Sequence, residues 1–441
     1  MTLTPEQVTA LAPDATSAAA GRKLSRPHDW KLLGQSAAAV WGECQGSTLY
    51  QVRVDLSNLS VKCSCPSRKF PCKHGLGLLL MFAGSPAALP KGAEPEWVSD
   101  WLARRAESEA RREAKREAKE EGRTAPIDEA AQARRAEKRQ AKVEEGAAGL
   151  SLWLSDLLRR GLSGLDAEGP AFWDAQAARL VDAQAAGLAA RVRALGEIPG
   201  SSRGWPEQLA REIGRLGLVL HAFGRLPALS PDLQADVRQM VGFQLPLEEV
   251  AAGPDVSSDR WVVLGQWVEE EDRIRTQRSW LRGTSGRDAL VLQFSVGSAP
   301  FPEALAPGSA IEGTLAFWPG AWPQRALVKE RRGATEAASA LPGAVNVDRF
   351  LSGVSEALSR QPFLERFPAV LSGVVPCPGP DGLLVADESG DALPLVAGPH
   401  HQLLTHSGGE PACLSGEWHR ERLRPLGLFS QGRYVPLTER S

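Results

Sequence analysis

The sequence has little of what marks membrane or secreted proteins. No apolar run approaches the roughly 20 residues needed to span a bilayer, and the start, MTLTPEQVTALAP, lacks a basic segment followed by an apolar one. Cysteine is scarce: six occur among 441 residues, and four of these lie between Cys44 and Cys72. In a reducing compartment such a cluster is better explained by a bound metal than by disulfides. We therefore expect a cytoplasmic protein.

The chain also lacks a charge excess and the common catalytic motifs. Its formal net charge of -2 gives no global reason to expect a nucleic-acid or membrane partner. Neither G-x-x-x-x-G-K-[ST] nor H-E-x-x-H occurs, so the chain lacks the usual signatures of phosphate-loop ATPases and of zinc-dependent peptidases. Residues 200–204, GSSRG, satisfy the hydrolase pattern G-x-S-x-G, but they follow Ile198-Pro199 rather than a buried strand and are predicted to form a loop. These absences favour a protein that is not an enzyme.

The length and composition indicate several globular domains. Hydrophobic residues make up 43% and charged residues 24%, the balance of a globular protein, and the length implies roughly two to four domains. Changes of pattern divide the chain into an N-terminal domain over 1–98, a charged helical connector over 99–147, a helical domain over 148–250, a β-rich domain over 251–345 and a C-terminal β-rich domain over 346–441. We therefore predict an α+β multidomain protein.

In the N-terminal domain the pattern predicts a hairpin followed by a helix. Residues 49–56 alternate apolar and polar side chains, and Val61 begins what should be the pairing strand. The run GLGLLLMFAG has no proline and no β-branched residue, so a short buried helix is predicted, with His74 in its first turn. The connector that follows has only Ile127 and Val143 as large apolar residues between 102 and 145, so it is predicted not to bury a core.

The remaining chain changes from helical to strand periodicity. From residue 149 to 242 apolar residues recur at spacings of three and four, which predicts an antiparallel helical bundle. Beyond residue 256 the period becomes two, with aromatic and β-branched residues, which predicts an antiparallel sheet or a small barrel. A helix is expected over 347–358, and hairpins follow it with turns at Pro380-Asp381-Gly382, Ser389-Gly390 and Gln431-Gly432.

One cluster carries recognisable chemistry: Cys63, Cys65, Cys72 and His74. Three thiolates and one imidazole form a four-coordinate set that suits Zn²⁺ and leaves no fifth position for a substrate water, so the predicted site is structural. The alternative is a group of reduced thiols in a core, without a bound metal. Cys44 could act as an alternative ligand, but it lies outside the compact pattern, and a buried strand cysteine is the favoured interpretation.

The spacing Cys-x-Cys-x6-Cys-x-His resembles the SWIM-type zinc finger. The stretch WGECQGS, the strand YQVRVDL and the segment KCSCPSRKFPCKHGLGLLL together resemble a bacterial SWIM zinc-finger family over residues 30 to 85. The resemblance implies a zinc-binding ββα module, about residues 50–85, that binds DNA or other proteins, and it implies no reaction. Similar bacterial proteins are often encoded beside AAA-type ATPases and von Willebrand factor A proteins, which implies an assembly with such partners.

Basic residues surround the predicted zinc ligands: Lys62, Arg68, Lys69 and Lys73. Zn²⁺ with three thiolates contributes -1, so the local charge is near +3, and no acidic residue occurs between Asp55 and Glu94. This surface could contact phosphates, with Phe70 as a stacking group. Basic residues near zinc thiolates also stabilise the negative cluster itself, so a protein partner stays an equal alternative.

We therefore expect a zinc-binding interaction protein whose finger binds nucleic acid, DNA in particular, or a partner protein, with the remaining domains as a scaffold. The alternative is an accessory subunit of an enzyme or ATPase complex, or an enzyme whose active site lies in the C-terminal β region. His400, His401 and His406 fall within seven residues, but without nearby cysteines they are interpreted as loop histidines rather than a second metal site.

Overall fold

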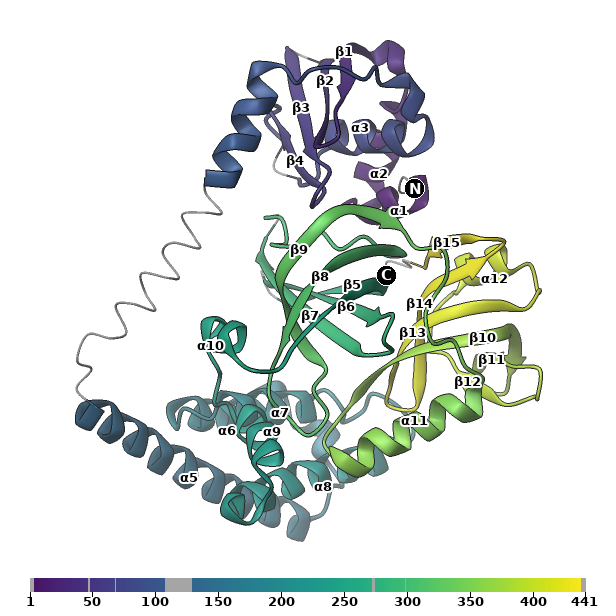
Figure 1. Ribbon diagram of the computed structural model, residues 1–441. Coiled ribbons are helices and arrows are strands. Elements are labelled where there is room, and N and C mark those ends of the chain that lie inside the picture. The colour runs from purple at the N-terminus through teal and green to yellow at the C-terminus, as the bar shows by residue number, and fades with distance from the viewer. Residues whose placement is uncertain are drawn as a thin grey trace.

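The computed structural model describes residues 4–46, 48–67, 69–107, 129–271, 274–297 and 299–437, with side chains described from residue 133 in the helix that begins at 129. Residues 108–128 of the predicted connector and Arg68 lie outside the described residues. Four parts are visible in Figure 1: a small α/β module at the top, a β-barrel at the centre, a second sheet at the right and a helical layer at the bottom. The α+β class predicted from the sequence is confirmed.

The N-terminal module is a four-stranded antiparallel sheet with helices. Its elements are α1 (Pro5–Ala10), α2 (Ala15–Lys23), β1 (Trp30–Gln35), β2 (Ala39–Gln45), β3 (Leu49–Asp55), β4 (Ser60–Cys63) and α3 (Lys73–Gly84), with short 3₁₀ turns at Pro27–Asp29 and Pro86–Ala88. The sheet order is β1-β2-β3-β4, so the predicted hairpin and helix are confirmed and two further strands precede them. Apolar residues of α3 pack on Val52 and Val54 at one sheet face.

A further helix covers part of the other face of this sheet. Residues 96–107 are helical, and Trp97 and Val98 pack with Trp41 of β2. The guanidinium carbon of Arg53 lies 5.2 Å from the ring centre of Trp97 and 5.7 Å from that of Trp101. Residues that the sequence assigned to the start of the connector therefore lie against the module.

The helical layer is an antiparallel bundle, as expected. Its elements are α5 (Glu129–Arg160), α6 (Pro170–Asp182), α7 (Ala186–Gly196), α8 (Trp205–Gly224), α9 (Pro231–Val241) and the short α10 (Leu247–Ala252), with 3₁₀ turns at Leu165–Ala167 and Leu226–Ala228. The sequence has one uninterrupted helical pattern over 172–195, but the structure divides it where Gln184 takes a left-handed φ of 60°. Val143 and Ala147 belong to the bundle core, so α5 crosses the boundary at residue 147 that the sequence pattern suggested.

The central part is a closed barrel of β5 (Val256–Glu271), β6 (Ile274–Gly283), β7 (Asp288–Val296), β8 (Ser309–Phe317) and β9 (Arg325–Ala337). The strand order is β5-β6-β7-β9-β8, and β7 and β9 form the parallel pair. Gly265 has a φ of 157° at a register shift in β5, and a Cβ there would lie 2.4 Å from the Cβ of Leu426, so this long strand bends where only glycine fits. The order is that of the five-stranded Greek-key barrel called the OB fold.

A six-stranded antiparallel sheet follows the barrel. Its elements are α11 (Val347–Arg360), β10 (Arg366–Gly379), β11 (Gly382–Ala386), β12 (Ala392–Pro394), α12 (His401–Ser407), β13 (Ala412–His419), β14 (Arg422–Ser430) and β15 (Arg433–Pro436), in the order β12-β11-β10-β13-β14-β15. The predicted helix and the turns at residues 380–382 and 431–432 are confirmed. The sheet shares a core with the barrel, in which the Tyr434 hydroxyl donates to the Leu264 carbonyl at 2.7 Å.

The N-terminal module docks on this β-rich body through α1. The Gln7 side-chain amide donates to the Gly308 carbonyl at 2.5 Å, and Arg433 pairs with Glu6 at 3.1 Å. A cleft of about 1840 Å³ remains between the module and the body. Leu59 and Phe70 line it from the module side, and Trp267 lines it from the barrel. In the described part of the chain no helix is both long enough and apolar enough to cross a membrane.

Candidate metal centre

The end of a strand and the start of a helix bring the four predicted ligands together. Cys63 is the last residue of β4, and Cys72 and His74 lie at the start of α3. Cys72 has an extended backbone and acts as the N-cap of α3, where its sulfur accepts a hydrogen bond from the Gly75 N–H at 3.5 Å. The helix start therefore orients two ligands toward the strand that carries the first.

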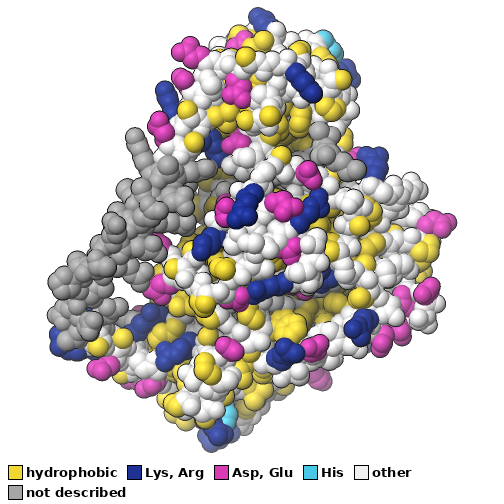
Figure 2. Space-filling model, viewed as in Figure 1, with side chains coloured by type: hydrophobic (Ala, Val, Ile, Leu, Met, Phe, Trp, Pro, Cys, Tyr) yellow, Lys and Arg dark blue, Asp and Glu magenta, His cyan; other side chains and the backbone are white. Residues whose placement is uncertain are grey.

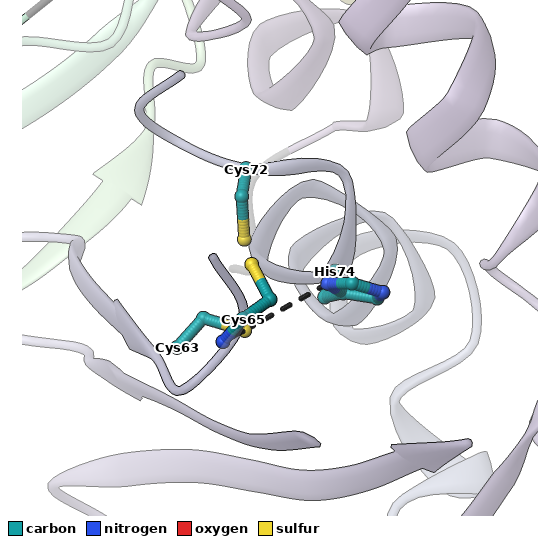
Figure 3. A group of neighbouring side chains, drawn as sticks. All are labelled: Cys63, Cys65, Cys72 and His74. Carbon is teal, nitrogen blue, oxygen red and sulfur yellow. Dashed lines mark hydrogen bonds between the residues drawn. The ribbon is translucent and has the colours of Figure 1, made fainter. Parts of the chain in front are cut away.

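The ligand atoms lie close enough for one ion. All four lie within 4.8 Å of one another, and the Cys63 sulfur lies 3.8 Å from Nδ1 of His74 (Figure 3). With Zn–S bonds of about 2.3 Å, a tetrahedral site needs sulfur–sulfur separations of about 3.8 Å. Cys72 and His74 are buried, whereas Cys63 and Cys65 are half-buried. The residues therefore fit a tetrahedral zinc ion, with all four positions filled by protein.

The thiols interact strongly because they are crowded. A hydrogen bond from Cys63, supported by His74 and the Gly75 N–H, lowers the pKa of Cys72 to about 4. The same hydrogen bond and burial raise the pKa of Cys63, and burial raises that of Cys65. Three thiolates in so small a volume repel one another, so a cation is what allows all three to ionise together.

One neighbour of the ligands, Tyr50, was not singled out by the sequence. The Tyr50 ring of β3 lies with its centre 5.0 Å from that of His74, at 42°, and restricts the imidazole. Alternation in β3 places Tyr50 on the same side as Val52, which is the signal that could have identified it. Cys44 is fully buried in the module core and is not part of the metal-binding group, in agreement with the favoured interpretation.

The residues predicted to contact nucleic acid have different surroundings. Lys62 and Lys73 are exposed, and each is adjacent in sequence to a ligand. Lys69 pairs with Asp14 of the α2 N-cap at 2.9 Å, and Phe70 packs partly against the module core and lines the cleft. Arg68 lies outside the described residues. Two of the five residues are thus exposed without an ion pair within the described parts of the chain.

The other motifs do not form sites. Residues 200–204 form a turn before α8, as expected. His401 and His406 belong to α12, and His400 precedes it with its Nε2 2.7 Å from the Val396 carbonyl. Among the described residues, the three thiols and His74 are the only group of three or more such side chains that could hold a metal.

Comparison with known families agrees with this geometry. Residues 50–83 match the SWIM zinc finger, and residues 138–241 match the SWIM-associated four-helix bundle domain. The first match contains all four ligands, and the second spans α5 from residue 138 through α9. No curated protein and no solved structure matches the chain. The chain thus carries a zinc-binding SWIM finger and the bundle associated with it.

Proposed function

We propose that this chain is a non-enzymatic, zinc-dependent binding protein whose SWIM finger contacts nucleic acid, DNA in particular, while the bundle and the β-rich body act as a scaffold. The closed coordination set supports this proposal most directly, because four protein ligands leave zinc no position at which to activate water. A reducing compartment would keep the clustered cysteines available as metal ligands, which supports the cytoplasmic location that is part of this proposal.

Exposed charge next to the metal supports a nucleic-acid partner. Lys62 of β4 precedes the ligand Cys63, and Lys73, the first residue of α3, lies between the ligands Cys72 and His74. Both lysines extend into solvent. Charge on the visible face of the molecule is mixed: Figure 2 shows basic and acidic side chains interspersed there. Contacts with the phosphate backbone of a nucleic acid are therefore expected to be centred on the finger.

A partner protein is the second candidate, and one observation favours it. Leu32 of β1 and Leu49 of β3 are 38% and 41% exposed on the module. Such side chains could bury apolar area against a protein, including the AAA-type ATPases and von Willebrand factor A proteins that the family resemblance suggests. In that case the chain would be the accessory subunit of a larger complex.

The deciding experiment titrates fluorescent single- and double-stranded DNA and RNA at two salt concentrations. The double variant K62E/K73E should weaken binding at least tenfold and flatten its salt dependence, because fewer phosphate contacts release fewer counterions. Zinc content by mass spectrometry should stay at one ion per chain. The matched control is K31E/K91E, which reverses two exposed lysines of the same module that do not adjoin a ligand.

Equal loss in both double variants would indicate general attraction and contradict a finger-specific contact. If neither nucleic acid binds the wild-type chain, the protein candidate replaces the first. The variant L32S/L49S should then reduce capture of a purified candidate partner, whereas K62E/K73E should have little effect.

A further inference from the structure

Three arginines surround one tryptophan where the barrel meets the C-terminal sheet. Trp267 of β5 lies opposite Arg278 of β6 in the strand register. Arg366 comes from β10 and Arg424 from β14, so the group joins two separate sheets. The guanidinium carbons of Arg424, Arg278 and Arg366 lie 4.6, 5.4 and 5.6 Å from the Trp267 ring centre.

The acidic neighbours do not balance these three charges. Glu417 is 1% exposed and pairs with Arg366, and Glu269 lies 3.5 Å from Arg278. Arg424 has no ion-pair partner in the described part of the chain, where its only recorded interaction is with the Trp267 ring. One positive charge therefore remains uncompensated at a half-buried position.

Hydrogen-bond donors at the same place are also unused. Nε of Arg278 and Nε1 of Trp267 are buried and have no partner among the described residues. A guanidinium that stacks on a ring uses its face and keeps its in-plane N–H donors free. Buried donors without a partner are costly, so an acceptor at this position would be stabilising.

The surroundings indicate which kind of acceptor fits this position. Trp267 and Arg424 line the cleft of about 1840 Å³, so these two members of the group are reached from solvent, whereas Arg278 does not line the cleft. Basic and acidic side chains line that cleft in equal number, so the cleft as a whole does not attract a long polyanion. The excess charge is local, and donors come from three strands, which suits the several oxygens of one phosphate group better than a planar carboxylate.

We propose that Arg424, Arg278 and Trp267 form a binding site for the phosphate group of a small phosphorylated ligand. Arg424 supplies the uncompensated charge, and the other two supply the unused N–H donors. Arg366 stays committed to Glu417 and holds the opposite side of the ring. This site is separate from the zinc finger and does not rest on the function proposed for it.

Inorganic phosphate is the probe, titrated into the full-length zinc-loaded chain by calorimetry at fixed ionic strength. Saturable binding should weaken at least tenfold in R424Q and stay within twofold of the wild type in R420Q. Arg420 is the matched control because it lies exposed in the turn of the same hairpin and does not stack on Trp267. R424K keeps the charge but not the fork of donors, so it should bind phosphate with intermediate affinity. Binding by R424K would also show that a folding defect at this position does not explain the loss of binding in R424Q.

Two further measurements make the result specific. Phosphate should change the tryptophan fluorescence of the wild type, and W267F should abolish that change. K62E/K73E should leave phosphate binding intact, so failure of the finger proposal and failure of this one remain distinguishable. No saturable binding at millimolar phosphate, or equal binding by R424Q and the wild type, would overturn the site. If an oligonucleotide binds through Arg424 and phosphate does not, the proposal of a small ligand is wrong and the ligand of this site is a polynucleotide.

Discussion

The finger module and the β-rich body are two regions of one chain that are stabilised by different means. In the module the sheet and α3 share an apolar core, but none of the described residues between Cys63 and Cys72 is fully buried. In the body the barrel and the six-stranded sheet pack face to face around Trp280, Leu426 and Tyr434. One region closes an irregular loop with a metal, and the other closes sheets with buried area.

The composition of each region determines which kind of stabilisation is available to it. A loop with Pro66, Pro71 and several polar residues cannot bury enough apolar surface to offset the entropy of ordering it, so a metal must supply that free energy. A barrel with a closed hydrogen-bond ladder has no edge to protect and gains from every inward side chain. The two regions should therefore respond differently to metal removal, charge removal and pH.

Loss of a zinc ligand should separate the two regions most clearly. The variant C72A, or treatment with a strong chelator, should remove zinc stabilisation that is on the order of 10 kcal/mol in finger peptides. Hydrogen exchange should show lost protection in β4 and α3, while β5 to β9 stay protected. C377S is the control, because this half-buried thiol belongs to β10 and is not part of the metal-binding group. Simultaneous loss of protection in both regions would show that they fold as one unit.

Removing a buried charge should affect the body in turn. Glu417 accepts hydrogen bonds from Trp280 Nε1 at 2.8 Å and from Arg366. E417Q leaves Arg366 without its counter-charge and should lower the free energy of unfolding by roughly 2 to 3 kcal/mol, since Arg366 keeps some solvent contact. Urea denaturation measures this value. E269Q removes an exposed partner of Arg278 and should cost under about 1 kcal/mol. Equal costs would argue that burial does not determine the effect.

A pH dependence should appear where the bundle meets the barrel. Burial raises the pKa of Asp236 to about 6, although the Ala321 N–H donates to its carboxylate at 2.8 Å. The folded-state pKa exceeds the unfolded value near 3.8, so the folded chain binds this proton more tightly and stability falls as pH rises through 6. D236N should remove that loss and stabilise the protein at pH 8 by on the order of 1 kcal/mol, after discounting for solvent. Melting temperatures of the wild type and D236N at pH 5 and pH 8 test this. If the two proteins differ by the same amount at both pH values, the assignment to Asp236 is wrong.

Sequence reasoning was strongest where the signal is local. The zinc ligands span twelve residues, so their spacing alone predicts the chemistry, and alternation or apolar runs of similar length predict β3 and α3. The strands β1 and β2 were not predicted because β1 has no clean alternation: two exposed residues adjoin in it. The division between α6 and α7 was missed because Gln184, neither glycine nor proline, takes the left-handed conformation.

Contacts between distant segments had no sequence signal. Arg424 and Trp267 are separated by more than 150 residues, and only the packing of two sheets places them together. The same holds for Lys69, which a basic pattern marks as a phosphate contact but which the fold places beside Asp14. Charge counted along a sequence does not reveal which charges are already paired, so the surface potential of the finger could not be predicted from its lysines alone.

Removal of the ion pair between Lys69 and Asp14 should give the smallest effect on the stability of the module. Hydrogen bonding to Lys69 and Ser17 lowers the pKa of Asp14 to about 2, so its contribution is present above pH 4 and is lost as pH falls through 2. D14A removes both the α2 N-cap and the pair and should cost about 1 kcal/mol, whereas K69Q should cost only a few tenths. Chelator-induced zinc release, followed with a colorimetric indicator, should be faster in D14A. Unchanged release would mean that zinc alone holds the loop, without help from α2.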